Sequence, residues 1–329
     1  MEPVTVVTVC FEAELQMVEL QARSLGLYLD PEHVTSVLLL DNSRSGLAPA
    51  FVDRLLPAYG ALADRVEVVR AGDVAPLPSA AGWRTQQILK LEVARRITSS
   101  RYVALDAKNH LIAPARPDFF EAADGRALVT SYSYATHPLQ PSLRHVLTYL
   151  GLDPEPHVSH FPATVTPYLL DTRVVLSLLD GLSTTRTFAD EFARNDLTEF
   201  FLYAGWQLKD GTLEERYDLS GAASPVVWPG GATAERVART IDAARTGRSP
   251  FFSVHRNALP RLDDDARAML ADLWADRGLV ANRDDGQTVL AAMTEQQRAH
   301  SPRRTVGDVP RLARVAARRA LRRVRRAAP

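Results

Sequence analysis

The sequence predicts an α/β fold with a mixed, mainly parallel sheet, helices on both faces and further C-terminal helices. Two patterns support this prediction. Over the first 135 residues, compact apolar runs alternate with longer segments whose apolar residues recur at helical spacing. The compact runs are also almost continuously apolar, which is typical of parallel strands that are covered on both faces.

The first unit is a strand over Val4–Phe11, rich in β-branched residues, followed by a helix over Glu12–Leu29. The same alternation continues along the chain. Further strands are expected at Val34–Leu40, Val66–Val69, Tyr102–Leu105 and Ala127–Tyr134, and helices at Phe51–Leu62 and Trp83–Ile97.

The pattern becomes less regular after residue 136, where prolines interrupt it. We expect a domain over residues 1–260, a helical extension over 261–300 and a basic tail over 301–329. The later elements expected are helices near Thr172–Leu179 and Asp190–Trp206, a strand at Pro250–Val254, and helices at Asp263–Trp274 and Asp285–Gln297.

Composition is that of a soluble globular protein, with 46% hydrophobic and 24% charged residues. A single cysteine, Cys10, excludes an intramolecular disulfide, argues against a thiolate zinc site and suits a reducing compartment. No basic segment precedes the first apolar run, and no run approaches the roughly 18 apolar residues of a membrane-spanning helix. We therefore expect a cytoplasmic protein.

Ligands of open α/β sheets bind beyond the carboxyl ends of the strands. In this sequence that rule selects Cys10–Glu12, Asp41–Ser43, Arg70–Asp73 and Asp106–His110. Several of these residues are polar or charged, as a nucleotide pocket requires.

The strongest local pattern is Leu105-Asp106-Ala107-Lys108-Asn109-His110 at a strand end. The Asp106 carboxylate can hold a divalent cation that bridges the two phosphates of a nucleotide sugar and neutralises charge on the leaving diphosphate. The same residues also fit an aspartate that begins a turn with the help of Asn109.

Another candidate surface lies on the helix near residue 90. Trp83, Gln86, Gln87 and Lys90 share one helix face, where amide and ammonium donors beside an aromatic ring suit hydroxyl-rich ligands and phosphates. The alternative is an ordinary solvated helix face.

Two later segments add candidates. Glu199 follows Thr198 near a helix start and could orient an acceptor hydroxyl or act as general base, although an acidic residue there also complements the helix dipole. His255 follows an apolar strand and could complete a metal site, with Arg256 pairing with phosphate. A surface histidine is the alternative.

Together these segments resemble the GT-A glycosyltransferases. They look most like a bacterial family of polysaccharide-type glycosyltransferase homologues long catalogued as a domain of unknown function. The resemblance spans roughly residues 4–257 and implies a GT-A-like (Rossmann-like) catalytic domain, a nucleotide-sugar donor, an aspartate-based metal motif and a later acceptor-side carboxylate. It is carried by Gly82-Trp83, Gln86-Gln87, Lys90-Leu91, the Leu105–His110 segment, Thr198–Tyr203 and Val254-His255-Arg256.

The metal motif departs from the family pattern. The usual motif is Asp-X-Asp, and Lys108 occupies the third position here. A protonated lysine cannot ligate a metal and repels one nearby. Either Asp106, Asn109 and His255 hold a weaker Mn²⁺ or Mg²⁺ site, or Lys108 itself contacts the diphosphate.

The expected function is transfer of a sugar from a nucleotide-diphosphate sugar to a glycan or lipid-linked acceptor in surface polysaccharide or glycoconjugate synthesis. The alternative is an inactive GT-A-like binding module or a membrane-tethered interaction protein. Asp106 and Glu199 are the expected catalytic residues, and Asp106 and His255 the metal ligands. The expected donor-binding residues are Cys10, Phe11, Glu12, Asp41, Asn42, Trp83, Arg84, Gln86, Gln87, Lys90, Lys108, Asn109 and Arg256.

The basic tail gives a separate expectation. Residues 303–326 hold ten arginines and one acid, a charge of +9 against −9 for the rest of the neutral chain. As a helix, this segment would be amphipathic, with its alanines largely opposite its arginines. It would suit an anionic membrane surface at the inner face of the plasma membrane. A disordered tail, or one folded on the acidic globule, is the alternative, and nucleic-acid binding has no aromatic platform to support it.

Overall fold

The computed structural model describes residues 2–77 and 82–300 and confirms the predicted fold class. Its central sheet has the strand order β3-β2-β1-β4-β9. In this order, β3, β2, β1 and β4 are parallel to their neighbours, and the edge strand β9 is antiparallel to β4. They are β1 (Val4–Cys10), β2 (Val34–Asp41), β3 (Val66–Arg70), β4 (Arg101–Asp106) and β9 (Tyr168–Asp171).

Helices cover both faces of this sheet, as expected for parallel strands joined by crossovers. On one face α1 (Leu15–Tyr28) packs against the 3₁₀ segment η3 (Leu56–Arg65), which follows α2 (Pro49–Leu55). On the other, α4 (Gly82–Glu92) packs on β1, and α6 (Thr172–Leu182) and α8 (Glu199–Lys209) pack against α4 and against each other. Every residue of β1 is buried, so the continuous apolar run seen in the sequence reflects its central position.

Strand register brings the carboxyl ends of the parallel strands to one edge. Cys10 pairs with Asp41, Asp41 with Arg70, and Val9 with Asp106. The strand-end residues selected from the sequence therefore do lie along the same edge of the sheet.

A second, three-stranded sheet extends this edge, with the order β11-β12-β5. β5 (Asn109–Leu111) follows β4 after a two-residue turn and pairs antiparallel with β12 (Phe251–Val254), which pairs in parallel with β11 (Val226–Val227). Ser253 lies opposite Asn109. Residues 250–256 are thereby brought beside a strand end nearly 150 positions earlier in the chain.

Two predicted elements are wrong in detail. Ala127–Tyr134 is not a fifth strand of the main sheet: β6 (Ala127–Leu128) pairs with β10 (Tyr217–Asp218), and β7 (Ser131–Tyr132) pairs with β8 (Phe161–Pro162). The expected helix Asp190–Trp206 is also two helices, α7 (Phe188–Arg194) and α8, because Asp196 adopts a positive φ of 52° that no α-helix continues through.

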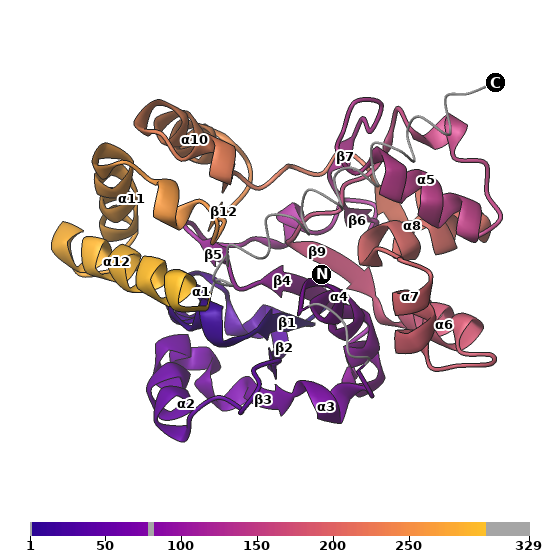
Figure 1. Cartoon of the computed structure of the whole chain (residues 1–329), viewed down its shortest axis with the longest axis horizontal. Helices are drawn as coiled ribbons and strands as arrows, with labels where there is room; N and C mark the ends of the chain where they lie inside the picture. Colours follow the sequence, from indigo (N-terminus) through magenta and orange to yellow (C-terminus); the bar gives the residue numbers. More distant parts are fainter. Residues whose placement is uncertain (1, 78–81, 301–329) are drawn as a thin grey trace, which may run out of the picture.

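The remaining helices flank the sheets on two sides (Figure 1). α10 (Ala234–Thr246), α11 (Asp264–Asp276) and α12 (Arg283–His300) pack on one another, and α12 also contacts α1. Buried Trp274 of α11 donates its indole N–H to His110 Nε2 at 3.0 Å, which ties this group to β5. The other helical elements are α3 (Ala71–Val74), α5 (Gln140–Tyr149), α9 (Leu213–Arg216), η1 (Glu12–Glu14), η2 (Pro31–His33), η4 (Val93–Arg96), η5 (Pro117–Phe119), η6 (Glu155–His157), η7 (Pro229–Gly231) and η8 (Leu259–Arg261).

The expected tail helix lies outside the described residues, and so does Ala81, which precedes α4. Among the described residues, no helix combines the length and apolar character needed to cross a membrane.

Candidate functional site

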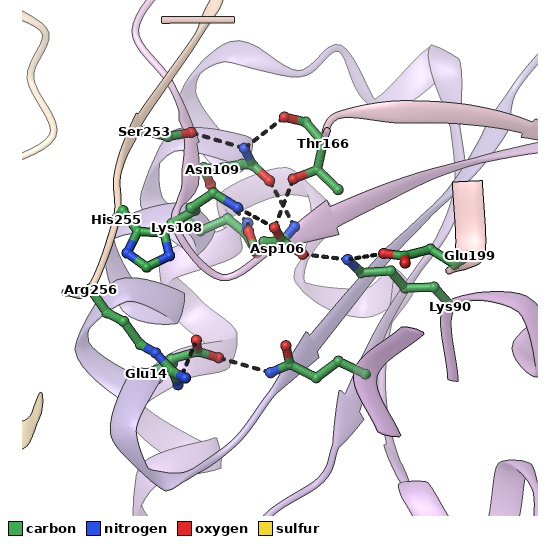
Figure 2. A network of polar contacts seen from close by, with 12 residues as sticks. Glu14, Lys90, Asp106, Lys108, Asn109, Thr166, Glu199, Ser253, His255 and Arg256 are labelled. Carbon is green, nitrogen blue, oxygen red and sulfur yellow. Dashed lines mark hydrogen bonds and ion pairs between the residues drawn. The ribbon is translucent and has the colours of Figure 1, made fainter. Parts of the chain in front are cut away.

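A cavity of about 260 Å³ opens at the carboxyl ends of β1 and β4. Its charged and titratable wall residues come from distant parts of the chain, and Figure 2 shows most of them converging. They are Glu14, Lys90, Asp106, Lys108, Glu199, His255 and Arg256.

Asp106 ends β4, and its carboxylate is engaged by two ammonium groups. Lys90 Nζ lies 2.5 Å from Oδ1, while Lys108 pairs with Oδ2. Thr166 also donates its hydroxyl to Oδ2 at 3.0 Å. Burial alone would raise the pKa of Asp106, but Lys108 and Lys90 reverse that effect and hold the pKa well below its ordinary value. This carboxylate is therefore ionised at any physiological pH.

The turn after Asp106 is held by hydrogen bonds from buried polar side chains. Asn109 Oδ1 accepts the Asp106 N–H at 2.7 Å, while its amide nitrogen donates to Ser253 Oγ and to the Thr166 carbonyl. Gln21 of α1, fully buried, donates to the carbonyls of Asp106 and Asn109 at 2.9 and 2.8 Å. Asn109 is thus a structural residue that shapes the turn, because its side chain bonds protein groups and is buried away from the cavity.

Lys90 reaches the cavity from α4 and is 5% exposed. Its ammonium lies between Asp106 and Glu199, 3.7 Å from Glu199 Oε1, and 5.5 Å from the centre of the Phe200 ring. Burial lowers its pKa, but the two carboxylates outweigh that effect and raise it overall. Lys90 is consequently a buried cation held between the buried carboxylate of Glu199 and the partly exposed carboxylate of Asp106.

Glu199 begins α8 and is 8% exposed. Its backbone N–H donates to Gln87 Oε1 at 3.3 Å, so Gln87 serves as a cap from another helix. Burial raises the pKa of Glu199, and Lys90 opposes the rise. Gln87 Nε2 is buried and has no hydrogen-bond partner among the described residues. This buried N–H donor in the cavity wall could donate a hydrogen bond to a ligand oxygen.

Glu14 is the main site residue that the sequence did not reveal. It ends η1, two residues beyond Glu12, and is 14% exposed beside Arg256, with Gln86 Nε2 3.4 Å from its carboxylate. Burial, assisted by the nearby Asp106 charge, raises the pKa of Glu14 to about 7 even though Arg256 lowers it. Its only sequence signal was an acidic residue shortly after the first strand.

Arg256 and His255 enter from the end of β12. The Arg256 guanidinium lies 4.7 Å from the centre of the Phe11 ring and 3.4 Å from Glu14 Oε1. His255 Nδ1 accepts the Asn257 N–H at 3.1 Å, and its ring lies 5.1 Å from that of Trp228. Burial, together with Lys108 and Arg256, lowers the pKa of His255 to about 4, so the ring is neutral at pH 7.

Two exposed tryptophans belong to the cavity wall. Trp83 is 58% and Trp228 is 48% exposed, large values for indole rings. Trp83 was expected from the sequence, whereas Trp228 precedes η7 and gave no signal. Flat, exposed rings at a polar cavity are suited to the apolar faces of sugars.

The cavity wall therefore includes nine of the expected site residues: Trp83, Gln86, Gln87, Lys90, Asp106, Lys108, Glu199, His255 and Arg256. Phe11 is not part of the cavity wall, but its ring packs against the Arg256 guanidinium. Asn42 donates its backbone N–H to the Cys10 carbonyl. Cys10 is fully buried in the core, where burial raises the pKa of its thiol.

Three other expected donor-binding residues organise loops outside the cavity wall. Asp41 is buried and accepts bonds from Ser43, Leu47 and Arg70. Glu12 accepts the Arg44 N–H, and Arg84 pairs with Asp196.

The expected metal site does not fit these residues. Both carboxylate oxygens of Asp106 are occupied by ammonium groups, and an ammonium beside Asp106 repels a divalent cation. Across the described ranges, no group of three or more His, Cys, Asp or Glu side chains is arranged to hold a metal ion. What the cavity offers instead is cationic side chains for an anion and carboxylates for hydroxyl groups.

A family model places the chain among known sequences. The model described as "Family of unknown function (DUF6492)" matches residues 13–227, more than half of the chain. The chain belongs to this family. The DUF6492 match includes every cavity residue named above except Trp228, His255 and Arg256. No curated protein matches the sequence.

Solved structures with similar folds include glycosyltransferases at low identity. The galactosyltransferase LgtC, solved with donor and acceptor sugar analogues, is 10% identical over 93% of this chain and 99% of that one, with a TM-score of 0.49. For an active-site mutant of LgtC, the match covers 43% of this chain and only 51% of that one, at 11% identity and a TM-score of 0.33. Glucosyl-3-phosphoglycerate synthase from Mycobacterium tuberculosis, solved with Mn²⁺ and UDP, is 13% identical over 66% and 68%, with a TM-score of 0.38.

Proposed function

We propose that this protein is a glycosyltransferase that binds a nucleotide-diphosphate sugar in the strand-end cavity and transfers the sugar to a hydroxyl acceptor. The observation that carries the proposal is the convergence of Lys90, Lys108 and Arg256 with the carboxylates of Asp106 and Glu199 at the carboxyl edge of a parallel sheet. The expected acceptors, a glycan or a lipid-linked sugar, belong to this proposal.

The cations would hold the diphosphate. An ammonium has three donor hydrogens, and within the described residues Lys108 bonds only Asp106, so it can also donate to a phosphate oxygen. Arg256 makes one long contact with Glu14 and keeps further N–H donors. Asp106 would hold Lys90 and Lys108 in place, and the charge of these cations would stabilise the leaving diphosphate.

Glu199 would orient or deprotonate the acceptor hydroxyl. It is a cavity carboxylate whose pKa burial raises, which makes it a better base at neutral pH than an ordinary glutamate. Trp83 and Trp228 would pack against sugar rings at the exposed part of the wall.

The direct test is a turnover screen of nucleotide-diphosphate sugars with purified full-length protein, paired with calorimetric binding. We expect at least one donor to bind and to be hydrolysed or transferred. Binding of a donor without any release of nucleoside diphosphate would instead favour the inactive binding module. The absence of both binding and turnover across the screen would refute the proposed function.

Metal removal should leave donor binding intact. Because Lys108 and Arg256 replace the cation expected at this position, we expect the nucleoside diphosphate affinity measured in EDTA to stay within about threefold of that in Mg²⁺ or Mn²⁺. Lys108→Met should weaken it about tenfold, the usual scale for one charge-assisted contact. A control is Lys209→Met, an exposed lysine of α8 that is outside the cavity. Binding that requires Mn²⁺ would contradict this prediction.

Glu14 should make donor binding sensitive to pH. With a pKa of about 7, its carboxyl is largely neutral at pH 6 and charged at pH 8, where it repels a diphosphate. Repulsion of roughly 1 kcal/mol corresponds to about fivefold weaker binding at the higher pH. Titrations at both values should show this loss in the wild type but not in Glu14→Gln, in which only the ligand's own ionisation remains. Equal pH dependence of the two proteins would exclude the role of Glu14.

A further inference from the structure

A second cavity, of about 440 Å³, lies at the opposite end of the β5–β12 pair. Ile112, directly after β5, and Pro250, directly before β12, are in its wall. Lys108 and His255, at the other ends of the same two strands, line the first cavity. The two cavities share no wall residue, so the second is a separate feature of the fold.

Arginine dominates the charge of this second cavity. Arg116, Arg245, Arg248 and Arg277 line it, against the single carboxylate of Asp118. Such an excess of cations is electrostatically unfavourable unless an anion binds in the cavity, because like charges in a partly desolvated wall repel one another.

These arginines are largely unpaired by the protein itself. Within residues 2–77 and 82–300, the side chains of Arg116 and Arg248 form no hydrogen bond or ion pair, and both residues are exposed. Arg277 Nε is buried without a hydrogen-bond partner in the same ranges. Arg245 has only a loose contact with Asp276, at 3.7 Å between Nη2 and Oδ2. Guanidinium donors are thus available, including one that is buried and unsatisfied.

The chemistry of the wall as a whole indicates which class of ligand this second cavity would bind. Small residues bring the backbone to the surface of the cavity, and apolar side chains form another part of the wall. A phosphoryl group matches the arginines best, because its oxygens accept paired guanidinium bonds. The small residues are Ala113, Gly221, Ala222, Ala244 and Gly247, and the apolar ones include Ile112, Phe119 and Leu128.

We propose that this arginine-lined cavity is a second ligand site, which binds a phosphate-bearing molecule independently of the strand-end cavity. The site does not depend on the proposed glycosyl transfer. The phosphoryl group could belong to a free phosphorylated metabolite or to a phospholipid headgroup, two sources that present the same chemistry to the arginines.

The test compares the wild type with three variants by calorimetry with inorganic pyrophosphate, each as the full-length protein. The double variant Arg116→Gln/Arg248→Gln should lose a binding event or weaken it about tenfold or more, as expected for two lost charge-assisted contacts. The matched control Arg173→Gln/Arg239→Gln removes two exposed arginines outside both cavities and should bind like the wild type. Lys108→Met should keep this event, which separates it from binding in the first cavity.

A second arm distinguishes the two sources, using phosphatidylcholine vesicles with and without phosphatidic acid. Selective loss of phosphatidic-acid binding in Arg116→Gln/Arg248→Gln supports a headgroup site, whereas selective loss of pyrophosphate binding supports a free phosphorylated ligand. Residues 303–326 are common to all variants and cancel in the comparison. If the double variant matches Arg173→Gln/Arg239→Gln with both probes, while thermal unfolding shows all proteins folded, the second site is refuted.

Discussion

Replacing Lys90 by methionine should lower the free energy of unfolding by about 3–5 kcal/mol, the usual cost of removing one partner from a buried ion pair. Lys90 is 5% exposed and lies between the carboxylates of Asp106 and Glu199. Its removal leaves Glu199 without a cation and Asp106 with Lys108 alone. Urea unfolding followed by circular dichroism measures the effect at pH 7.

The same variant should show a characteristic pH dependence. Burial raises the pKa of Glu199, and losing Lys90 raises it further, so this carboxylate takes up a proton at a higher pH in the variant than in the wild type. Neutralisation relieves the unpaired charge, and the stability deficit of Lys90→Met should therefore shrink as the pH is lowered. Lys209→Met is the matched control, because Lys209 is exposed, lies on the same helix as Glu199 and is outside the cavity wall. A deficit no larger than that of the control would show that the buried charge cluster does not stabilise the fold.

Glu199→Gln should reduce the turnover of an accepted donor–acceptor pair by about 10²–10⁴, the range associated with loss of a general base. Donor affinity should change little, since Lys108 and Arg256, and not Glu199, are proposed to hold the diphosphate. The measurement is kcat, together with donor affinity from calorimetry. Thermal unfolding confirms that the variant is still folded without the Glu199 carboxylate beside Lys90.

Glu235→Gln provides the control for this substitution, because its carboxylate is 80% exposed on α10 and outside both cavities. It should retain wild-type kcat. Wild-type turnover in Glu199→Gln would remove Glu199 from the chemistry, while a loss confined to donor affinity would make it a binding residue. Assaying Glu14→Gln in parallel tests whether the base is Glu14, another cavity carboxylate, since that variant would then carry the large loss in kcat.

The sequence was most informative where structure is determined locally. The continuous apolar run of β1 and the periodic residues of α1 predicted both elements closely, because a strand buried on both faces and an amphipathic helix leave distinct patterns. Parallel register then made the positions of Asp41 and Asp106 predictable, since the carboxyl ends of such strands meet at one edge. The irregular middle of the chain gave poorer predictions, because β6 and β7 are two-residue strands whose partners are distant in sequence.

The site shows the same division. Lys90, Asp106, Lys108 and Glu199 could be identified individually from their places on predicted elements. Their pairing could not, because the contacts join α4, β4 and α8, and the sequence pattern of each element is compatible with many distances between them. Because of this pairing, the Asp106 carboxylate, expected to bind a metal, is instead paired with Lys90 and Lys108.

The sequence by itself therefore determined the α/β class, the strand-end location of the candidate site and most of the chemical groups in its cavity wall, because periodicity and strand ends are properties of contiguous residues. Only the tertiary structure decided which groups meet. Antiparallel pairing of β5 with β12 brought Arg256 to Glu14, and burial raised the pKa of Glu14 to about 7. Such effects depend on the solvent and charges around a side chain, and these are set by segments as far apart in the sequence as Glu14 and Arg256, which are separated by 242 positions.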